Sequence, residues 1–235
     1  MPGAVRLCGE AALRSGAGLV SIATDASHAA TIVASRPELM PHGIQGVQDL
    51  APLLERADVI AFGPGLGRSP WAQHLFEVIA DDPRPAVWDA DALNLLSESP
   101  AKKDNRVITP HPGEAGRLLG MSAAEIQADR RSALEALQQK YGGVAVLKGA
   151  GSLVSAGSGS PWLCTLGNPG MAAAGMGDVL TGIIAALMAQ GVGAEEAAAV
   201  GVDVHARAGD VAAASGERGI LASDLIAVIR DIVNP

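Results

Sequence analysis

The stretch Gly167–Gly191 reads G-N-P-G-M-A-A-A-G-M-G-D-V-L-T-G-I-I-A-A-L-M-A-Q-G, and it decides how the rest of the chain is interpreted. A loop with glycines at 167, 170, 175 and 177 runs directly into Val179–Ala189, an apolar segment typical of a buried helix. The first amides of a helix lack backbone acceptors and carry partial positive charge, so a glycine-rich approach lets an anion come close. The stretch therefore predicts an anion site, although not a Walker P-loop, because no G-K-[ST] follows.

Asp178 lies at the junction between this loop and the predicted helix. A carboxylate beside a bound anion is repelled by it, so we expect Asp178 to accept a proton from a reacting hydroxyl rather than to bind phosphate. The alternative is that Asp178 is only the N-cap or first-turn acid of a buried helix.

Composition limits the kinds of fold and partner. A chain of 235 residues with 49% apolar but only 3% aromatic residues is expected to form a single domain over residues 1–235, with a core of small aliphatic side chains. The net charge of −8 argues against a nucleic-acid surface, because phosphates require clustered cations. A polyanionic ligand would then depend on backbone amides and a bound Mg²⁺ for positive potential.

The start of the chain and its cysteines indicate a compartment. Charged residues interrupt the first apolar positions and no apolar run reaches membrane-spanning length, so we expect neither a signal peptide nor a membrane span. Cys8 and Cys164 are far apart and have no C-x-x-C spacing, which favours neither a zinc site nor a disulfide. We therefore expect a cytoplasmic protein.

The first elements have an unusual order for an α/β chain. Apolar positions between residues 4 and 12 recur with helical spacing, Ser15-Gly16 ends the helix, and residues 18–23 are typical of a strand. In βαβ units a strand normally precedes the first helix, so we expect a first strand to be missing from this sequence.

Four later strand candidates share one feature, which is a polar or glycine-rich cluster directly after the apolar run. Residues 58–62 precede G-P-G-L-G, 86–88 precede D-A-D, 106–108 precede T-P-H-P-G-E, and 144–147 precede K-G-A-G. Ligands of open parallel sheets bind outside the carboxyl ends of the strands, so these clusters are expected to meet in one crevice. The alternative is that the clusters are only turn residues.

The remaining pattern predicts mainly helices. We expect short helices near residues 27–34 and 47–56, an extended segment at 38–41, one long helix from the capping box at Ser122 to about Lys140, and an antiparallel excursion around a turn at 155–160. Two further helices are expected at 194–214 and 224–233, the second capped by Ser223.

Each side chain at the predicted crevice has a functional and a structural interpretation. Glu114 could hold Mg²⁺ directly or through water, or could be a first-turn acid, whereas His111 between two prolines favours ligand contact. Asp89 and Asp91 alternate along an extended backbone, so only one can point into the crevice and the other is expected to cap the helix carrying Asn94.

Two further residues complete the candidates. Lys148 could contact a phosphate or extend along the sheet edge to solvent. Asn168 could cap the glycine loop or donate to a bound anion.

Five ordered motifs together resemble a known family. They are G-P-G-L-G at 63–67, D-A-D-A-L-N at 89–94, T-P-H-P-G-E at 109–114, V-L-K-G-A-G at 146–151 and N-P-G-M-A-A-A-G-M-G-D-V-L-T-G at 168–182. Over nearly the whole chain they resemble the ADP- or ATP-dependent NAD(P)H-hydrate dehydratases of the ribokinase-like superfamily. The resemblance implies a three-layer α/β fold with a mostly parallel sheet and helices on both faces.

The resemblance also implies an activity. (6S)-NADHX and (6S)-NADPHX, the hydrated nicotinamide cofactors, are returned to NADH and NADPH while ADP becomes AMP and phosphate, with ATP as a less favoured donor and Mg²⁺ as cofactor. It implies a homotetramer and, because this sequence carries no epimerase domain, a separate epimerase.

Site residues follow from the same resemblance. Asp178 matches the catalytic aspartate, and Glu114 matches the acid that organises Mg²⁺ through water. Contacts to the hydrated nucleotide, in which Asp178 also takes part, match Ala4, Gly65, Gly67 and His111. The nucleotide site matches Lys148, Gly149, Ala150, Gly151, Ser152 and Gly177, with Asn168 beside it.

Two departures and two alternatives remain. Family members commonly begin with a strand and a G-G turn ahead of the position matching Met1, and both are absent from this sequence. One alternative is a small-molecule kinase of the same superfamily that acts on a vitamin or sugar. The other is a nucleotide-binding protein without catalytic activity.

Overall fold

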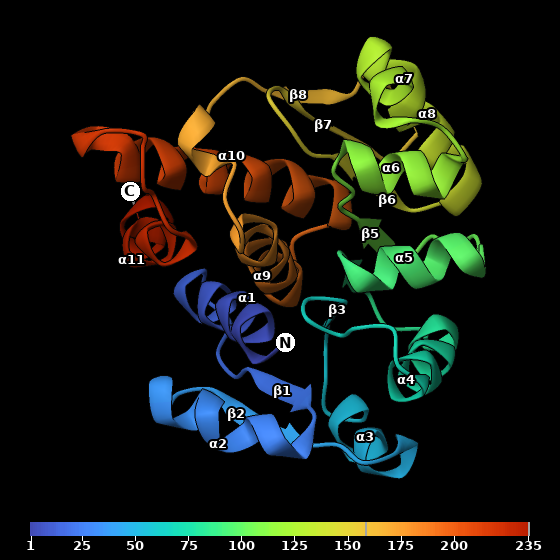
Figure 1. Cartoon of the computed structure of the whole chain (residues 1–235), viewed down its shortest axis with the longest axis vertical. Helices are drawn as coiled ribbons and strands as arrows, with labels where there is room; N and C mark the ends of the chain where they lie inside the picture. The colour runs from blue at the N-terminus through green and yellow to red at the C-terminus, as the bar shows by residue number, and fades with distance from the viewer. Residues whose placement is uncertain (158, 235) are drawn as a thin grey trace.

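The computed structural model describes residues 1–157 and 159–234, and helices cover both faces of a central sheet (Figure 1). The strands are β1 (Ser21–Thr24), β2 (Met40–Gly43), β3 (Ile60–Phe62), β4 (Ala86–Trp88), β5 (Arg106–Ile108), β6 (Val144–Leu147), β7 (Ser152–Ser155) and β8 (Trp162–Cys164). The helices are α1 (Pro2–Arg14), α2 (Ala26–Ser35), α3 (Val47–Leu54), α4 (Pro70–Asp81), α5 (Asp91–Glu98), α6 (Pro112–Leu119), α7 (Ala123–Ala128), α8 (Arg130–Tyr141), α9 (Met176–Ala189), α10 (Ala194–Ala212) and α11 (Ala222–Ile232), with 3₁₀ turns η1 (Pro169–Met171) and η2 (Ala213–Ser215).

The main sheet has the strand order β3-β4-β5-β6-β7-β8. Strands β3 to β6 run parallel, with Phe62 opposite Trp88 and Trp88 opposite Ile108, whereas β7 pairs antiparallel with both β6 and β8. The predicted mostly parallel sheet and the antiparallel excursion are confirmed. The predicted turn at 155–160 includes Ser158, which lies outside the described residues.

Strands β1 and β2 form a separate parallel pair. Among the described residues, β1 and β3 have no partner strand on the sides that face each other, and a cavity of about 730 Å³ lies between them. Its lining includes the whole of both strands together with residues of α1 and α9. The two sheets are therefore not joined by hydrogen bonds.

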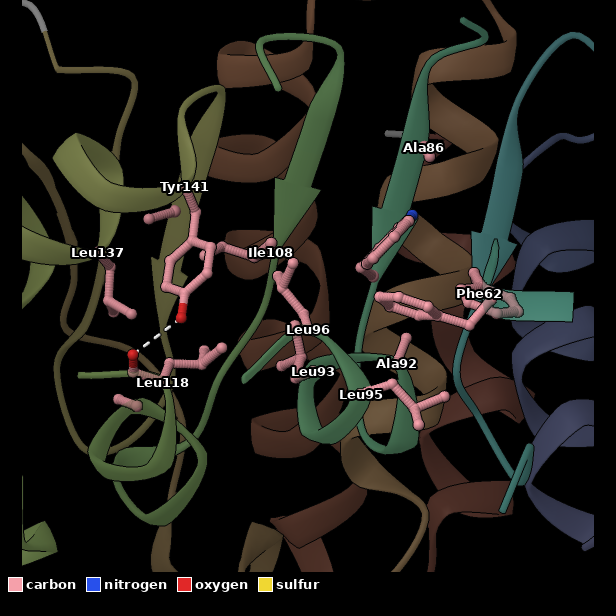
Figure 2. Packing of buried hydrophobic residues seen from close by; sticks show 14 of the residues in the cluster. Phe62, Ala86, Ala92, Leu93, Leu95, Leu96, Ile108, Leu118, Leu137 and Tyr141 are labelled. Carbon is pink, nitrogen blue, oxygen red and sulfur yellow. Dashed lines mark hydrogen bonds between the residues drawn. The ribbon is translucent and has the colours of Figure 1, made fainter. Parts of the chain in front are cut away.

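One face of the main sheet packs against α4, α5, α6 and α8. Figure 2 shows the part of this core that involves α5, α6 and α8. Phe62 and Trp88 meet edge to face with ring centroids 5.4 Å apart, and Tyr141 donates a hydrogen bond of 2.8 Å to the Leu118 carbonyl. Burial of a large aromatic side chain releases much apolar surface from water, and the hydroxyl needs such a partner. Packing in this core fixes the positions of the ends of β4 and β5.

The opposite face packs against α9 and α10 through the alternate residues of the strands, such as Val87, Val107 and Val146. Helix α1 lies directly on α9, where Gly182 has no room for a side chain because a methyl group would overlap the Cys8 carbonyl. The helix that follows the glycine-rich loop is thus the central support of this layer.

Two expected helix boundaries are wrong. The long helix expected from Ser122 to about Lys140 is divided at Asp129, because the Asp129 carboxylate accepts hydrogen bonds from the amide and hydroxyl of Ser132 and starts α8. Ser223 does not cap the last helix. Leu221 is the N-cap residue, and Asp224 accepts a hydrogen bond of 2.8 Å from its amide.

Candidate active site

The loops after β3, β4, β5 and β6 meet at one edge of the sheet, as predicted, because these strands are parallel neighbours. Lys148, after β6, places its Nζ 2.6 Å from Asp89 Oδ1, after β4. The same Nζ lies 3.8 Å from Oε2 of Glu114, in the turn after β5. Three motifs that are far apart in the sequence therefore share one charged centre.

Asp89 is the residue that sequence reasoning left without a definite role. Its side chain is almost completely buried, and its second oxygen accepts a hydrogen bond of 3.2 Å from the Thr181 hydroxyl on α9. Asp91 instead accepts hydrogen bonds from the amide of Gly67 and the side chain of Asn94. The expectation that only one of the two aspartates points into the crevice is confirmed, because only Asp89 joins Lys148. The expectation that the other caps the helix is wrong, because Ala90 is the N-cap residue of α5 and Asp91 already lies inside the helix.

Helix α9 begins directly against this ion pair. A methyl group at Gly177 would stand 3.0 Å from Lys148 Nζ and 3.1 Å from Asp89 Oδ2. Gly175, two residues before Gly177, is the N-cap residue of α9. Its φ of 89° lies in the left-handed region, which favours glycine. Gly175 thus suits a left-handed turn, and a side chain at Gly177 would crowd the ion pair of Lys148 and Asp89.

Three amides at the start of α9 have no acceptor among residues 1–157 and 159–234. The first α-type hydrogen bond runs from the amide of Val179 to the Gly175 carbonyl, which leaves the amides of Met176, Gly177 and Asp178 free. Free amides at a helix start attract anions. The geometry agrees with the predicted anion site.

Asp178 lies in this first turn, within electrostatic reach of Lys148 and Glu114. Burial, followed by the negative charge of Asp89, raises the pKa of the Asp178 carboxyl to about 6. Glu114 and Asp91 raise the pKa further, whereas Lys148 lowers it. An ionised carboxylate with such a pKa is suited to accept a proton near neutral pH.

This pKa predicts a pH-dependent contribution to stability. The folded protein holds the Asp178 proton more tightly than the unfolded chain, so this contribution is present at pH 4 and is lost as the pH rises through about 6. The loss amounts to about 3 kcal/mol, because one pKa unit corresponds to about 1.36 kcal/mol. Urea unfolding at pH 4 and pH 7 should therefore show Asp178→Asn gaining stability relative to wild type as the pH rises. A pH-independent difference between the two proteins would contradict the assignment.

His111 and Glu114 form a capping box at the start of α6. The Glu114 carboxylate accepts a hydrogen bond of 2.8 Å from the His111 amide, and His111 Nδ1 accepts from the Gly113 and Glu114 amides. The neutral imidazole therefore carries its proton on Nε2, which lies 3.6 Å from Glu114 Oε1. Glu114 is thus a first-turn acid that caps α6, and it also lies beside Lys148.

The G-P-G-L-G loop follows β3 and lies against the start of α1. A methyl group at Gly65 would stand 3.2 Å from Cβ of Ala4, and the Gly65 carbonyl accepts a hydrogen bond from the Met1 amino group. Gly67 is tied to α5 through Asp91. Ala4, Gly65 and Gly67 are therefore grouped, at the side of the site where α1 begins.

Asn168 is the candidate with the fewest connections to the site. Its carbonyl oxygen accepts from the Gly170 amide, as expected for a cap of the glycine loop, and its amide group donates to Asp210 on α10. Within the described part of the chain no hydrogen bond joins Asn168 to the Lys148 loop.

The chemistry of the site suits Mg²⁺ held through water. The carboxylates of Asp89, Asp91 and Glu114 lie within electrostatic reach of the Asp178 carboxylate, as does the Lys148 ammonium group. No three His, Cys, Asp or Glu side chains of residues 1–157 and 159–234 gather closely enough to bind a metal directly. Mg²⁺ keeps several waters and uses substrate phosphates as ligands, so Glu114 and Asp178 fit this mode.

The fold and the charged crevice define a class, the ribokinase-like proteins, which is supported by comparison with known proteins. A ribokinase-like protein of Enterococcus faecalis aligns over 99% of this chain and 82% of its own, with 31% identity and a TM-score of 0.89. The family profile described as NAD(P)H-hydrate dehydratase matches residues 1–231. The chain belongs to the NAD(P)H-hydrate dehydratase family.

Individual relatives agree with this family. The bifunctional NAD(P)H-hydrate repair enzyme Nnr of Coxiella burnetii is 51% identical over 100% of this chain and 48% of its own, and that of Escherichia coli is 51% identical over 99% and 45%. The chain thus spans about half the length of these curated relatives. The ADP/ATP-dependent NAD(P)H-hydrate dehydratase of Bacillus subtilis, crystallised with ATP and Mg²⁺, covers all of this chain and 85% of its own at 28% identity, with a TM-score of 0.85.

None of the helices in the described ranges combines the length and the hydropathy that a bilayer span requires.

Proposed function

We propose that this chain dehydrates (6S)-NADHX and (6S)-NADPHX to NADH and NADPH while converting ADP, or less favourably ATP, to AMP or ADP and phosphate. The observation that carries the proposal is the position of Asp178. It combines a raised pKa with three free amides and lies within electrostatic reach of Lys148 and Glu114. The family and the dehydratase of Bacillus subtilis support it.

In this proposal the nucleotide and the hydrated cofactor approach Asp178 from two sides. The phosphates of ADP lie on the loop from Lys148 to Ser152 and on the start of α9 at Gly177. The hydrated nicotinamide ring lies near His111 and the Ala4–Gly65 side. The protein contributes by holding the two anions in line and keeping water away from them.

Asp178 accepts the proton of the ring hydroxyl as that oxygen attacks the terminal phosphorus of ADP. The bond between this phosphorus and AMP breaks, and AMP leaves with the electron pair. The ring then carries a phosphate ester, and phosphate is a much better leaving group than hydroxide. Loss of phosphate and of a proton from the neighbouring ring carbon restores the double bond.

The free amides of α9 and the Lys148 ammonium stabilise negative charge on the phosphoryl oxygens. Bound Mg²⁺ would neutralise further phosphoryl charge. Glu114 and Asp178 are the residues proposed to orient its water ligands.

Incubation of the purified chain with NADHX, Mg²⁺ and either ADP or ATP tests this function. We expect recovery of NADH absorbance together with one phosphate per NADH. Accumulation of a stable phosphate ester would instead support a small-molecule kinase, and nucleotide binding without NADH recovery would support a binding protein. Either outcome would overturn the proposal.

The proposed partners depend on this activity. An epimerase that converts the (6R) hydrates to the (6S) form is proposed to supply the substrate, in keeping with the bifunctional repair enzymes among the relatives. Assembly as a tetramer stays a prediction, as does the cytoplasmic location.

A further inference from the structure

Arg130 begins α8 and reaches under the loop that follows β6. Its Nη2 donates hydrogen bonds of 3.0 Å to the carbonyls of both Leu147 and Gly151, and its Nη1 lies 3.4 Å from the Lys148 carbonyl. Nη1 also donates to the Gln127 side chain. One guanidinium group therefore donates hydrogen bonds to carbonyl oxygens at both ends of the loop.

The loop carbonyls are nearly all engaged on the protein side. In addition to the three that face Arg130, the Gly149 carbonyl accepts a hydrogen bond of 3.1 Å from the Ser152 hydroxyl. By contrast, the amides of Gly149, Ala150 and Gly151 have no acceptor within residues 1–157 and 159–234. The carbonyls of Leu147, Lys148, Gly149 and Gly151 are thus engaged, whereas three successive amides are free.

This difference between carbonyls and amides has a consequence for anion binding. Successive free backbone amides form a concave site for phosphate, but a carbonyl oxygen turned toward the same phosphate would repel it. A planar guanidinium carries five donors on three nitrogens in a fixed arrangement, so it can reach carbonyls at both ends of the loop, whereas lysine has its three donors on one nitrogen. The loop backbone also allows this arrangement, because Gly149 and Gly151 have φ values of 140° and 72°.

We propose that Arg130 is a positioning residue that holds the carbonyls of the Lys148–Ser152 loop away from the ligand, so that the amides of Gly149, Ala150 and Gly151 bind a nucleotide phosphate. This inference rests on the proposed function, because it assumes that the loop binds a nucleotide. Arg130 is placed to act through the loop and not by contact with the reacting atoms.

The test compares Arg130→Met and Arg130→Lys with the matched control Arg131→Met. Arg131 is the next residue on α8, but its side chain is exposed and pairs only with Glu135 on the same helix. Calorimetric titration of the complete chain with ADP, and the KM values for ADP and for NADHX, are the readouts. If Arg130 only stabilised the packing of α8, its replacement would change both KM values or neither of them.

For Arg130→Met we expect the Kd for ADP to rise by about tenfold, because several charge-assisted hydrogen bonds that shape the loop are lost. The KM for NADHX should change by less than about twofold. Arg130→Lys should recover part of the affinity, because its ammonium group can still donate to some of these carbonyls, and Arg131→Met should bind ADP as the wild type does. A folded Arg130→Met protein with unchanged ADP affinity would overturn the inference. If Arg130→Met does not fold, unchanged ADP affinity of Arg130→Lys would overturn it.

Binding measurements on the wild-type chain distinguish failure of the dehydratase function from failure of the role of Arg130. A wild-type chain that binds neither ADP nor ATP would overturn the proposed function and the inference with it. A wild-type chain that binds ADP and recovers NADH, beside an Arg130→Met variant of equal ADP affinity, would overturn the inference alone.

Discussion

Replacement of Asp178 by asparagine should reduce NADH recovery by about 10²–10⁴-fold, because the ring hydroxyl loses its proton acceptor. Nucleotide affinity should not fall. The amide has the size of the carboxylate, leaves the α9 amides in place and removes a negative charge beside the bound phosphate. The rate of NADH formation and a calorimetric titration with ADP measure the two effects.

Asp210 provides the control for this variant. It lies on α10, where its carboxylate accepts from Gly167 and Asn168, and it does not contribute to the Lys148 centre. Asp210→Asn removes the same charge from the end of the glycine-rich loop and should retain most of the activity. Turnover of Asp178→Asn close to that of the wild type would remove this carboxylate from the mechanism.

Replacement of Lys148 by methionine should lower the free energy of unfolding by about 3–5 kcal/mol, because the buried Asp89 carboxylate would lose its charged partner. The same change removes the ammonium group proposed to meet the nucleotide phosphates. Urea unfolding curves and the Kd for ADP should both be affected. Lys102→Met, at an exposed position, serves as the stability control.

A second variant separates the two consequences. The double variant Lys148→Met with Asp89→Asn removes the unpaired carboxylate of Asp89, and the asparagine oxygen can still accept from Thr181. We expect most of the lost stability to return while nucleotide affinity stays low. If the double variant is no more stable than Lys148→Met, the cost does not arise from an uncompensated charge at Asp89.

Strand-end clusters could be recognised from the sequence because the features that create them are local. The strands Arg106–Ile108 and Val144–Leu147 are followed within two residues by Pro110 and Gly149, which are typical of turns, and the capping box at Ser122 needs only four consecutive residues. Their meeting in one crevice followed from the rule for parallel strands and required no side-chain detail.

The division between α7 and α8 at Asp129 could not be predicted from such local features. The helical spacing of apolar residues continues across it, and Asp129 is an acceptable residue within an exposed helix. What ends α7 is the hydrogen bonding of Asp129 to Ser132, which competes with the continuation of the helix. This new start also brings Arg130 to the beginning of α8, from where it reaches the loop after β6.

The sequence by itself determined the order of the elements, the glycine-rich start of α9 and the polar residues at each strand end, because these depend on neighbours a few residues away. The partners of those polar residues were decided only by the tertiary structure. Lys148 meets Asp89 across 59 residues, and Thr181 meets it across 92, because strands β4, β5 and β6 lie side by side and α9 packs across them. Burial at that meeting point then raises the pKa of Asp178, since desolvation depends on the packed layers and not on local sequence.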